Sequence, residues 1–284
     1  DYIKLLFKKA DEIIGYNLSK LILEGPQDKL GQTTFTQPAI YLIGCAICDV
    51  LRNETNFFDK KFSFFAGHSL GEYTALTAAN SLTLEQGLYL LKYRGEFMQS
   101  AVPLGEGGML AVLGISSNEL KEISNETSDQ IKYYLANDNS NGQLIVSGYN
   151  NELEKFSMFL KEKKIKNIKL PVSAPFHCEL MREATLKMKK IIIDQKIETP
   201  NFKIVSNVTA TKYKNPNEIK ELLIKQIESP VRWRESIEYM ISEGTRTFVE
   251  IGPGKVLSGL IKRINKEVKV LNIDTLEDIQ DINL

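Results

Sequence analysis

A serine stands between two glycines in the segment GHSLG, residues 67–71, directly after the apolar run FSFFA. The helix-favouring segment EYTALTAAN follows it. A G-x-S-x-G pattern between a strand and a helix is typical of a nucleophile elbow, in which small neighbours let the backbone turn sharply and expose one hydroxyl. The pattern predicts that Ser69 is a nucleophile if a base and a group that stabilises negative charge lie nearby.

The chain offers two candidates for the base, because His68 and His177 are its only histidines. His68 adjoins Ser69, and side chains of neighbouring residues at a sharp turn point apart. His177 follows a predicted strand in PVSAPFHCELM. A lone histidine is more often a packed core residue, but the elbow and the lack of another base favour His177 as the general base. Two histidines also argue against a histidine-rich metal site.

Arg94, in LLKYRGEFMQ, lies on a predicted apolar helix. It could be a surface arginine whose stem lies along the helix, which is common. A buried guanidinium instead needs an anion, and its planar fork suits a carboxylate. If Arg94 is buried, it therefore predicts a substrate that carries a carboxylate. An α/β-hydrolase places its catalytic histidine late in the chain. In this sequence no histidine occurs between His177 and the last residue, 284. A plain esterase is therefore disfavoured.

The composition indicates a globular protein without a bias toward one class of partner. Of 284 residues, 43% are hydrophobic and 25% charged, with 36 Lys and Arg against 36 Asp and Glu. No net field favours nucleic acid, no apolar run approaches the ~18 residues of a membrane span, and the first residues show no secretory pattern. We therefore expect neither nucleic acid nor membrane as a partner.

The three cysteines indicate a reducing compartment. We expect the cytoplasm, with a plastid-type organelle as the alternative. Cys45 and Cys48 form a C-x-x-C, which can be a redox pair. They lie in the apolar segment PAIYLIGCAICDVL, which Pro38 can begin as a first-turn residue of a helix. In such a buried helix, cysteine packs as a small hydrophobic residue, and this interpretation is favoured over redox chemistry.

The order of the predicted elements is that of an α/β protein with an insertion. Residues 105–173 show the order βαββαβ, which is the ferredoxin-like motif. Strands alternate with helices on either side of this segment, as a parallel sheet requires. The sequence predicts an α/β-hydrolase-like large domain, residues 1–104 and 174–284, with a parallel sheet. Residues 105–173 form the small subdomain, and a ligand is expected in the cleft between the two units.

Taken together, the motifs resemble those of the malonyl-CoA:acyl carrier protein transacylases, the free-standing malonyltransferases of type II fatty acid synthesis. The resemblance covers nearly the whole chain in the right order. The matching segments are GHSLGEY, YRGEFMQSAVPLGEGGM, NDNSNGQLIVSG, PVSAPFHCELM, SPVRW and EIGPGKVLSGLIKR. The resemblance implies that Ser69 accepts the acyl group, that His177 is its base and that Arg94 pairs with the malonyl carboxylate.

The resemblance implies further roles around these three residues. In the family a backbone carbonyl orients the histidine, here that of Gln226. The amide after the serine, that of Leu70, forms part of the oxyanion hole with an amide from an N-terminal GQGSQ-like loop, which this sequence does not show. The bulk of Phe176 resembles members that take malonyl in preference to its α-methyl homologue. Gln37, in TQPA, resembles a residue that lines the site.

Three further residues are weaker candidates for contact with the substrate. They are His68, to which we assign no proton transfer, and Asn137 and Asn139, which turn formation would explain equally well.

The resemblance implies ping-pong transfer of malonyl from malonyl-CoA, with release of coenzyme A, to acyl carrier protein. No cofactor is implied beyond malonyl-CoA as the substrate, and we expect a monomer. The alternatives are an acyltransferase for another acyl group, a hydrolase and a carrier-binding protein without catalysis. Arg94 distinguishes malonyl transfer from the first alternative, because an unsubstituted acyl chain has no anion for this arginine to bind.

Overall fold

The computed structural model describes residues 2–59, 62–127, 130–172 and 174–281. Its helices are α1 Tyr2–Ile14, α2 Leu18–Glu24, α3 Gln27–Leu30, α4 Thr33–Glu54, α5 Gly71–Ala78, α6 Leu84–Ser100, α7 Ser117–Thr127, α8 Asn150–Glu162, α9 Arg182–Ile193, α10 Pro216–Gln226, α11 Trp233–Ser242, α12 Val256–Ile264 and α13 Leu276–Gln280, with short 3-10 turns at Phe57–Asp59 and Glu179–Met181. Its strands are β1 Phe64–Phe65, β2 Gly107–Leu113, β3 Tyr134–Ser140, β4 Gln143–Tyr149, β5 Lys166–Lys169, β6 Lys203–Ile204, β7 Thr247–Ile251 and β8 Lys269–Ile273.

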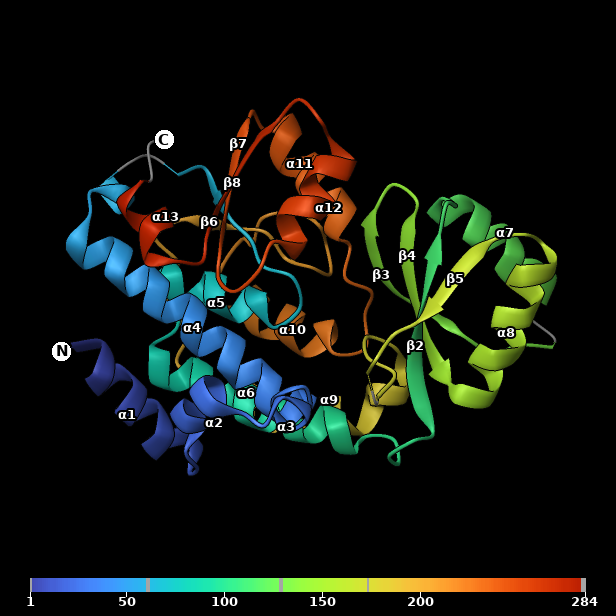
Figure 1. Cartoon of the computed structure of the whole chain (residues 1–284), viewed down its shortest axis with the longest axis horizontal. Coiled ribbons are helices and arrows are strands. Elements are labelled where there is room, and N and C mark those ends of the chain that lie inside the picture. The colour runs from blue at the N-terminus through green and yellow to red at the C-terminus, as the bar shows by residue number, and fades with distance from the viewer. Residues whose placement is uncertain (1, 60–61, 128–129, 173, 282–284) are drawn as a thin grey trace.

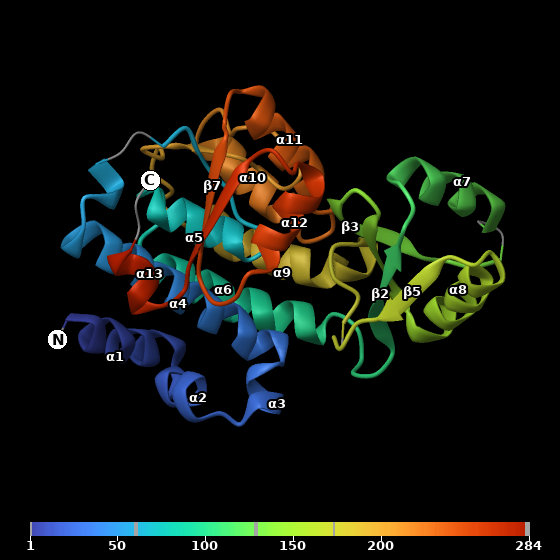
Figure 2. The same ribbon diagram turned by 45° about the horizontal axis from the view of Figure 1, so that its top comes forward.

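The strands β2 to β5 and the helices α7 and α8 lie together at one end of the molecule, where β3 faces α11 and α12 (Figure 1, Figure 2). Their sheet is antiparallel, in the order β3-β4-β2-β5. Residues on β2 alternate between two faces, as strand geometry requires. Leu110 and Val112 pack with α7 and α8 in one cluster, while Met109 and Ala111 pack with the segment that returns toward α9. The observed order of elements is the predicted βαββαβ; Ser173, the predicted end of this unit, lies outside the described residues.

Helix α4 crosses the larger part of the molecule and packs against α6 (Figure 1). It begins at Thr33, so the prediction that Pro38 begins this helix was wrong. The first turn is held against α6, where a Cβ on Gly95 would come within 2.8 Å of the Thr33 carbonyl oxygen. This packing stabilises the helical turn that precedes Pro38. The proline by itself removes only one backbone hydrogen bond near the start of the helix.

The 22 residues of α4 also correct the expectation that no apolar run approaches the length of a membrane span. Within the part of the chain that the structure describes, α4 is long and apolar enough to cross a membrane by length and composition alone. Its side chains Tyr41, Leu42 and Cys45 are buried in the main hydrophobic cluster. The core helix of a folded protein passes the same test.

The parallel strands pair two by two and do not join into the one sheet that we predicted. Among the described residues, β1 pairs with β6 and β7 pairs with β8. An apolar groove of about 620 Å³, lined by residues of both β1 and β7, separates the two pairs. Strand β1 is short because the chain turns into the elbow at Gly67. Strand β6 ends at Ile204, and Asn207, which follows it, contacts the elbow.

Residues 231–234 connect the larger part of the molecule to the edge strand β3. The Val231 amide donates to the Ala136 carbonyl, and the Asp138 amide donates to the Val231 carbonyl. Two nitrogens of the Arg234 guanidinium donate to the Asp138 carboxylate, at 2.7 Å for the shortest pair. Bidentate pairs of this kind fix geometry as well as adding energy. The end of β3 is therefore held beside the elbow.

Candidate active site

Ser69 occupies a sharp turn between β1 and α5, with φ at 53°. A non-glycine residue in this left-handed region is uncommon and is often found at functional sites. The side chain of Asn207 holds the turn from both sides, because its Nδ2 donates to the Gly67 carbonyl at 2.8 Å and its Oδ1 accepts from the Ser69 amide at 2.7 Å. The predicted elbow is therefore present, and it is clamped by a residue far away in the sequence.

The Ser69 hydroxyl contacts the ring of His177, with 2.8 Å between Oγ and Nε2. The other ring nitrogen, Nδ1, lies 2.8 Å from the backbone oxygen of Gln226. A carbonyl can only accept, so Nδ1 carries the proton and Nε2 is free to accept one from Ser69. His177 is buried, and its burial, with the positive charge of Arg94 as the second cause, lowers its pKa to about 3. The imidazole is thus neutral at neutral pH, as a general base must be.

Arg94 lies on α6 with its guanidinium against the nucleophile. The side chain is 1% exposed. Its Nη1 donates to Gln37 Oε1 at 2.5 Å, and its Nη2 donates to Gln226 Oε1 at 2.9 Å and to Ser69 Oγ at 3.1 Å. No carboxylate pairs with it within the described ranges, and its Nε makes no hydrogen bond there. The desolvation of this cation lowers its pKa, and a buried cation without a paired anion is costly.

The Leu70 amide lies at the N-terminus of α5. In the described part of the chain, the amides of Gly71, Glu72 and Tyr73 each donate to the carbonyl three residues earlier. The Leu70 amide precedes these three, and the amides at the start of a helix have no acceptor within the helix. The helix dipole makes this end positive. The Leu70 amide is thus placed beside Ser69 where an oxyanion would be stabilised.

The remaining predicted residues lie around this centre. His68 makes no hydrogen bond to Ser69 among the contacts described; its Nε2 lies 2.8 Å from Asn139 Oδ1 on β3, and its ring packs edge-on to Trp233. Phe176 is half-buried between the main cluster and the sheet of β2 to β5. Asn137 forms a backbone bridge with Val231 and so serves the connection between the two parts.

Comparisons with known proteins show the family to which the chain is similar. The model of the family described as acyl transferase domain matches residues 6–279. The malonyl CoA-acyl carrier protein transacylase of Bacillus subtilis (strain 168) is 42% identical over 279 residues, which is 98% of this chain and 87% of that protein. The crystal structure of an acyl-carrier-protein-S-malonyltransferase from Bartonella henselae superposes with a TM-score of 0.94 at 38% identity, covering 98% of this chain and 89% of that one.

A third comparison concerns a complex. The malonyl-transacylase in a structure with a type II PKS acyl-carrier protein matches with a TM-score of 0.93 at 32% identity, over 98% of this chain and 89% of that one. The chain belongs to the malonyl CoA-acyl carrier protein transacylase family. The predicted resemblance is confirmed, the fold is α/β like that of its structural neighbours, and the chain is an acyltransferase.

Glu72, Asn207 and Tyr213 join the site but were not predicted from the sequence. Glu72 is fully buried and accepts hydrogen bonds from the Tyr213 hydroxyl, from Gln226 Nε2 at 2.6 Å and from the Asn207 amide at 3.3 Å. Burial raises its pKa to about 7 despite these donors. One signal was available: an acidic residue three positions after a nucleophile, on the first turn of a helix whose neighbours are apolar, cannot reach solvent easily. Nothing local identifies Asn207 or Tyr213.

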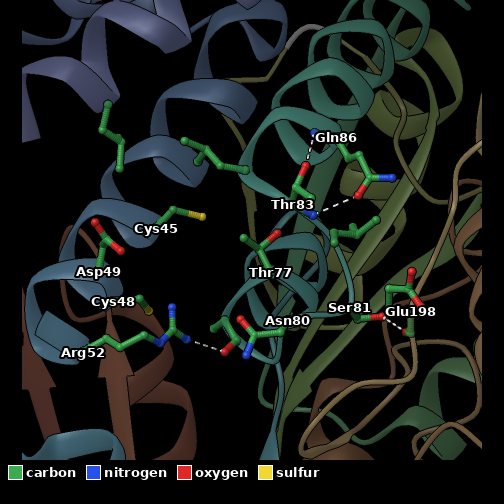
Figure 3. Close-up of a pocket in the computed structure, with 14 residues that line it drawn as sticks. Cys45, Cys48, Asp49, Arg52, Thr77, Asn80, Ser81, Thr83, Gln86 and Glu198 are labelled. Atoms are coloured by element: carbon green, nitrogen blue, oxygen red, sulfur yellow. Dashed lines mark hydrogen bonds between the residues drawn. The ribbon is translucent and has the colours of Figure 1, made fainter. Parts of the chain in front are cut away.

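The thiols of the C-x-x-C line a different cavity, of about 300 Å³, between α4 and the end of α5 (Figure 3). Cys45 and Cys48 are free and buried there, beside Asp49, Arg52 and Thr77. Burial raises the pKa of Cys45 and raises that of Cys48 to about 12. The thiolate is the reactive form of cysteine, so both residues serve as core packing.

The described residues contain no group of three or more His, Cys, Asp or Glu side chains arranged to hold a metal ion.

Proposed function

We propose that the chain transfers the malonyl group from malonyl-CoA to the phosphopantetheine thiol of acyl carrier protein through a malonyl-serine ester, and so supplies fatty acid biosynthesis. The observation that carries the proposal is the contact between Arg94 and Ser69. A buried guanidinium, which pairs with no carboxylate of the described residues, lies 3.1 Å from the nucleophilic oxygen. In malonyl-CoA, one methylene separates the carboxylate from the thioester carbonyl, so the counter-ion for that carboxylate must lie next to the nucleophile.

The first half of the reaction acylates the serine. Nε2 of His177 takes the proton of Ser69 Oγ as this oxygen attacks the thioester carbonyl carbon. The Leu70 amide and the positive end of α5 stabilise the oxyanion that develops. The carbon–sulfur bond then breaks, and coenzyme A leaves with the proton from Nε2. The Gln226 carbonyl holds the Nδ1 proton throughout, which keeps the imidazole in the required tautomer.

The second half reverses these roles. The thiol of phosphopantetheine gives its proton to His177 Nε2, and its sulfur attacks the ester carbonyl. Ser69 Oγ leaves and regains a proton from the imidazole. The printed title of one structural neighbour describes a complex of a malonyl-transacylase with an acyl-carrier protein, which supports a carrier protein as the acceptor here. No step requires a metal or redox cofactor.

We further propose the division into a large α/β-hydrolase-like domain, residues 1–104 and 174–284, and a ferredoxin-like subdomain, residues 105–173. The separate sheet of β2 to β5 and its strand order support this division. A cytoplasmic location is supported by the bacterial relatives and by the three free, buried cysteines.

The test is a direct search for the intermediate. Incubation with malonyl-CoA followed by intact-protein mass spectrometry should show one malonyl adduct, and peptide mapping should place it on Ser69. Addition of holo acyl carrier protein should then discharge the adduct with formation of malonyl-carrier protein. Release of free malonate without carrier protein, at the same rate, would instead identify a hydrolase.

A further inference from the structure

The buried carboxylate of Glu72 lies directly behind the site and does not contact Ser69 Oγ, His177 or Arg94 in any hydrogen bond described. It stands on the first turn of α5, is fully buried and contacts two residues of the site, through the side chain of Gln226 and the backbone amide of Asn207. A fully buried acid is rare unless it is paired. Its position therefore calls for a role.

We propose that Glu72 is a positioning residue that sets the orientation of the Gln226 amide and thereby holds Arg94 in place to receive the carboxylate of the substrate. This inference rests on the proposed malonyl transfer. Gln226 lies between an acid and a base: its Nε2 donates to Glu72 Oε2 at 2.6 Å, and its Oε1 accepts from Arg94 Nη2 at 2.9 Å.

Above a pH of about 7, where Glu72 is ionised, the chemistry of the three groups permits only one orientation of this amide. An ionised carboxylate only accepts hydrogen bonds, and a guanidinium only donates them. Nε2 must therefore face Glu72, and Oε1 must face Arg94. With a neutral amide in place of the carboxylate, the Gln226 side chain could turn over and direct its NH₂ group at the guanidinium, which would lose an acceptor.

Separation from Arg94 is part of the proposed role. Glu72 acts on Arg94 through its charge, but the Gln226 amide keeps the two apart. A carboxylate in direct contact would occupy the planar fork that a substrate carboxylate needs for bidentate binding. One amide away, Glu72 offsets part of the cost of burying the cation and leaves its donors available.

The same amide also reaches the nucleophile. Gln226 Nε2 donates to the Ser69 carbonyl at 3.0 Å, and the Gln226 backbone oxygen accepts from His177. The backbone contact does not depend on the orientation of the side chain. Loss of Glu72 should therefore affect recognition of the substrate carboxylate more than the proton transfer between Ser69 and His177.

The experiment compares Glu72→Gln with Glu250→Gln in the full chain. Glu250 is the control, because it is a partly buried glutamate whose carboxylate accepts from two backbone amides at the start of α12, those of Leu257 at 3.0 Å and Ser258 at 2.7 Å. The readout is kcat/KM for malonyl-CoA and for acetyl-CoA. Glu72→Gln should lower the value for malonyl-CoA by about ten- to a hundredfold, as loss of a hydrogen bond to a charged group does. The value for acetyl-CoA should fall far less, and Glu250→Gln should leave the ratio unchanged.

A second comparison tests the link to Arg94 even if Glu72→Gln does not fold. Arg94→Ala leaves Glu72 as a buried charge without its cation, which is strongly unfavourable. The double variant Glu72→Gln/Arg94→Ala removes both charges, so it should melt at a higher temperature than Arg94→Ala alone. A lower melting temperature for the double variant would overturn the inference, because Glu72 would then stabilise the fold independently of Arg94.

The wild-type protein separates the two levels of the proposal. If it transfers malonyl and prefers malonyl-CoA to acetyl-CoA, the proposed function stands. Equal losses on both substrates in Glu72→Gln would then overturn only the role of Glu72. If the wild-type protein forms no malonyl adduct, the proposed function itself fails.

Discussion

Ser69 and His177 face each other across 2.8 Å, and both residues adopt the left-handed backbone conformation, with φ at 53° and 58°. A β-carbon makes this region unfavourable, and such strain persists only where the surrounding structure enforces it. At Ser69 the enforcing group is the Asn207 side chain, which bonds both Gly67 and Ser69. These backbone conformations direct the Ser69 hydroxyl and the His177 ring toward each other, although the two residues lie far apart in the sequence.

Replacement of the nucleophile should abolish the intermediate. Ser69→Ala should show no malonyl adduct by intact-protein mass spectrometry and should lose transfer by several orders of magnitude, as removal of a catalytic nucleophile does. The alanine variant keeps the backbone amide that Asn207 binds, so circular dichroism should remain that of the wild type. An adduct that persists on this variant would place the acyl group elsewhere, with the neighbouring buried thiol Cys178 the first residue to map.

The two histidines should differ sharply. His177→Ala should cost nearly as much activity as Ser69→Ala, because residues that act as one unit are not additive. His68→Ala should cost less, because His68 bonds Asn139 and is given no proton transfer. The measurement is the single-turnover rate of serine acylation in each variant. The reverse order of losses would reassign the base.

Arg94 should determine the choice of substrate. Removal of one partner from a buried charge pair costs about 3–5 kcal/mol, a factor of roughly a hundred to a few thousand. Arg94→Ala should therefore lose malonyl transfer by such a factor and retain more of its acetyl transfer. Arg94→Lys should not restore malonyl transfer, because an ammonium cannot reproduce the planar fork. The values of kcat/KM on both coenzyme A esters decide this, and equal losses would make Arg94 a structural residue.

The depressed pKa of His177 predicts the response to pH. Its pKa of about 3 lies below the ordinary value of about 6.5, so the base stays neutral in the folded protein well into the acidic range. Acetylation of Ser69, which needs no carboxylate contact, should show no loss of kcat/KM near pH 6.5. Because the unfolded chain takes up a proton at His177 before the folded one does, this histidine contributes stability above pH 6.5 that is lost as the pH falls toward 3. A half-maximal acetylation rate near pH 6.5 would contradict the assignment.

The sequence predicted the parts of the site that depend on local pattern. The elbow follows from two glycines around Ser69, and the choice of base follows from the scarcity of histidine. The role of Gln226 came from the resemblance to a family, and the structure places its carbonyl on His177 as that resemblance implied. The clamp by Asn207 could not be found in this way, because it depends on which residue follows β6 in space.

The fold shows the same limit. The order βαββαβ predicted for residues 105–173 is the observed order of elements, because the alternation of strands and helices follows from local hydrophobic periods. The predicted start of α4 was wrong, since contacts with α6 decide it. The pairing of the parallel strands also depends on long-range contacts, so the hydrophobic period of each segment does not predict it.

The two glycines of the elbow should respond very differently to alanine. A β-carbon at Gly67 would lie 1.9 Å from the Gly71 carbonyl oxygen and 2.6 Å from the Glu72 nitrogen, whereas a β-carbon at Gly71 meets no atom within 4 Å. The atoms in the way at Gly67 are backbone at the start of α5, so the helix or the strand must move. Overpacking of this kind costs about 1–3 kcal/mol or more.

Gly67→Ala should therefore lower the melting temperature and abolish the malonyl adduct, because the displaced helix carries Glu72 away from Gln226 and the oxyanion amide away from Ser69. Gly71→Ala should melt close to the wild type, since neither its space nor its backbone conformation requires glycine. Thermal unfolding of the two variants side by side is the measurement, and equal melting temperatures would show that the approach of β1 to α5 is looser than the structure has it.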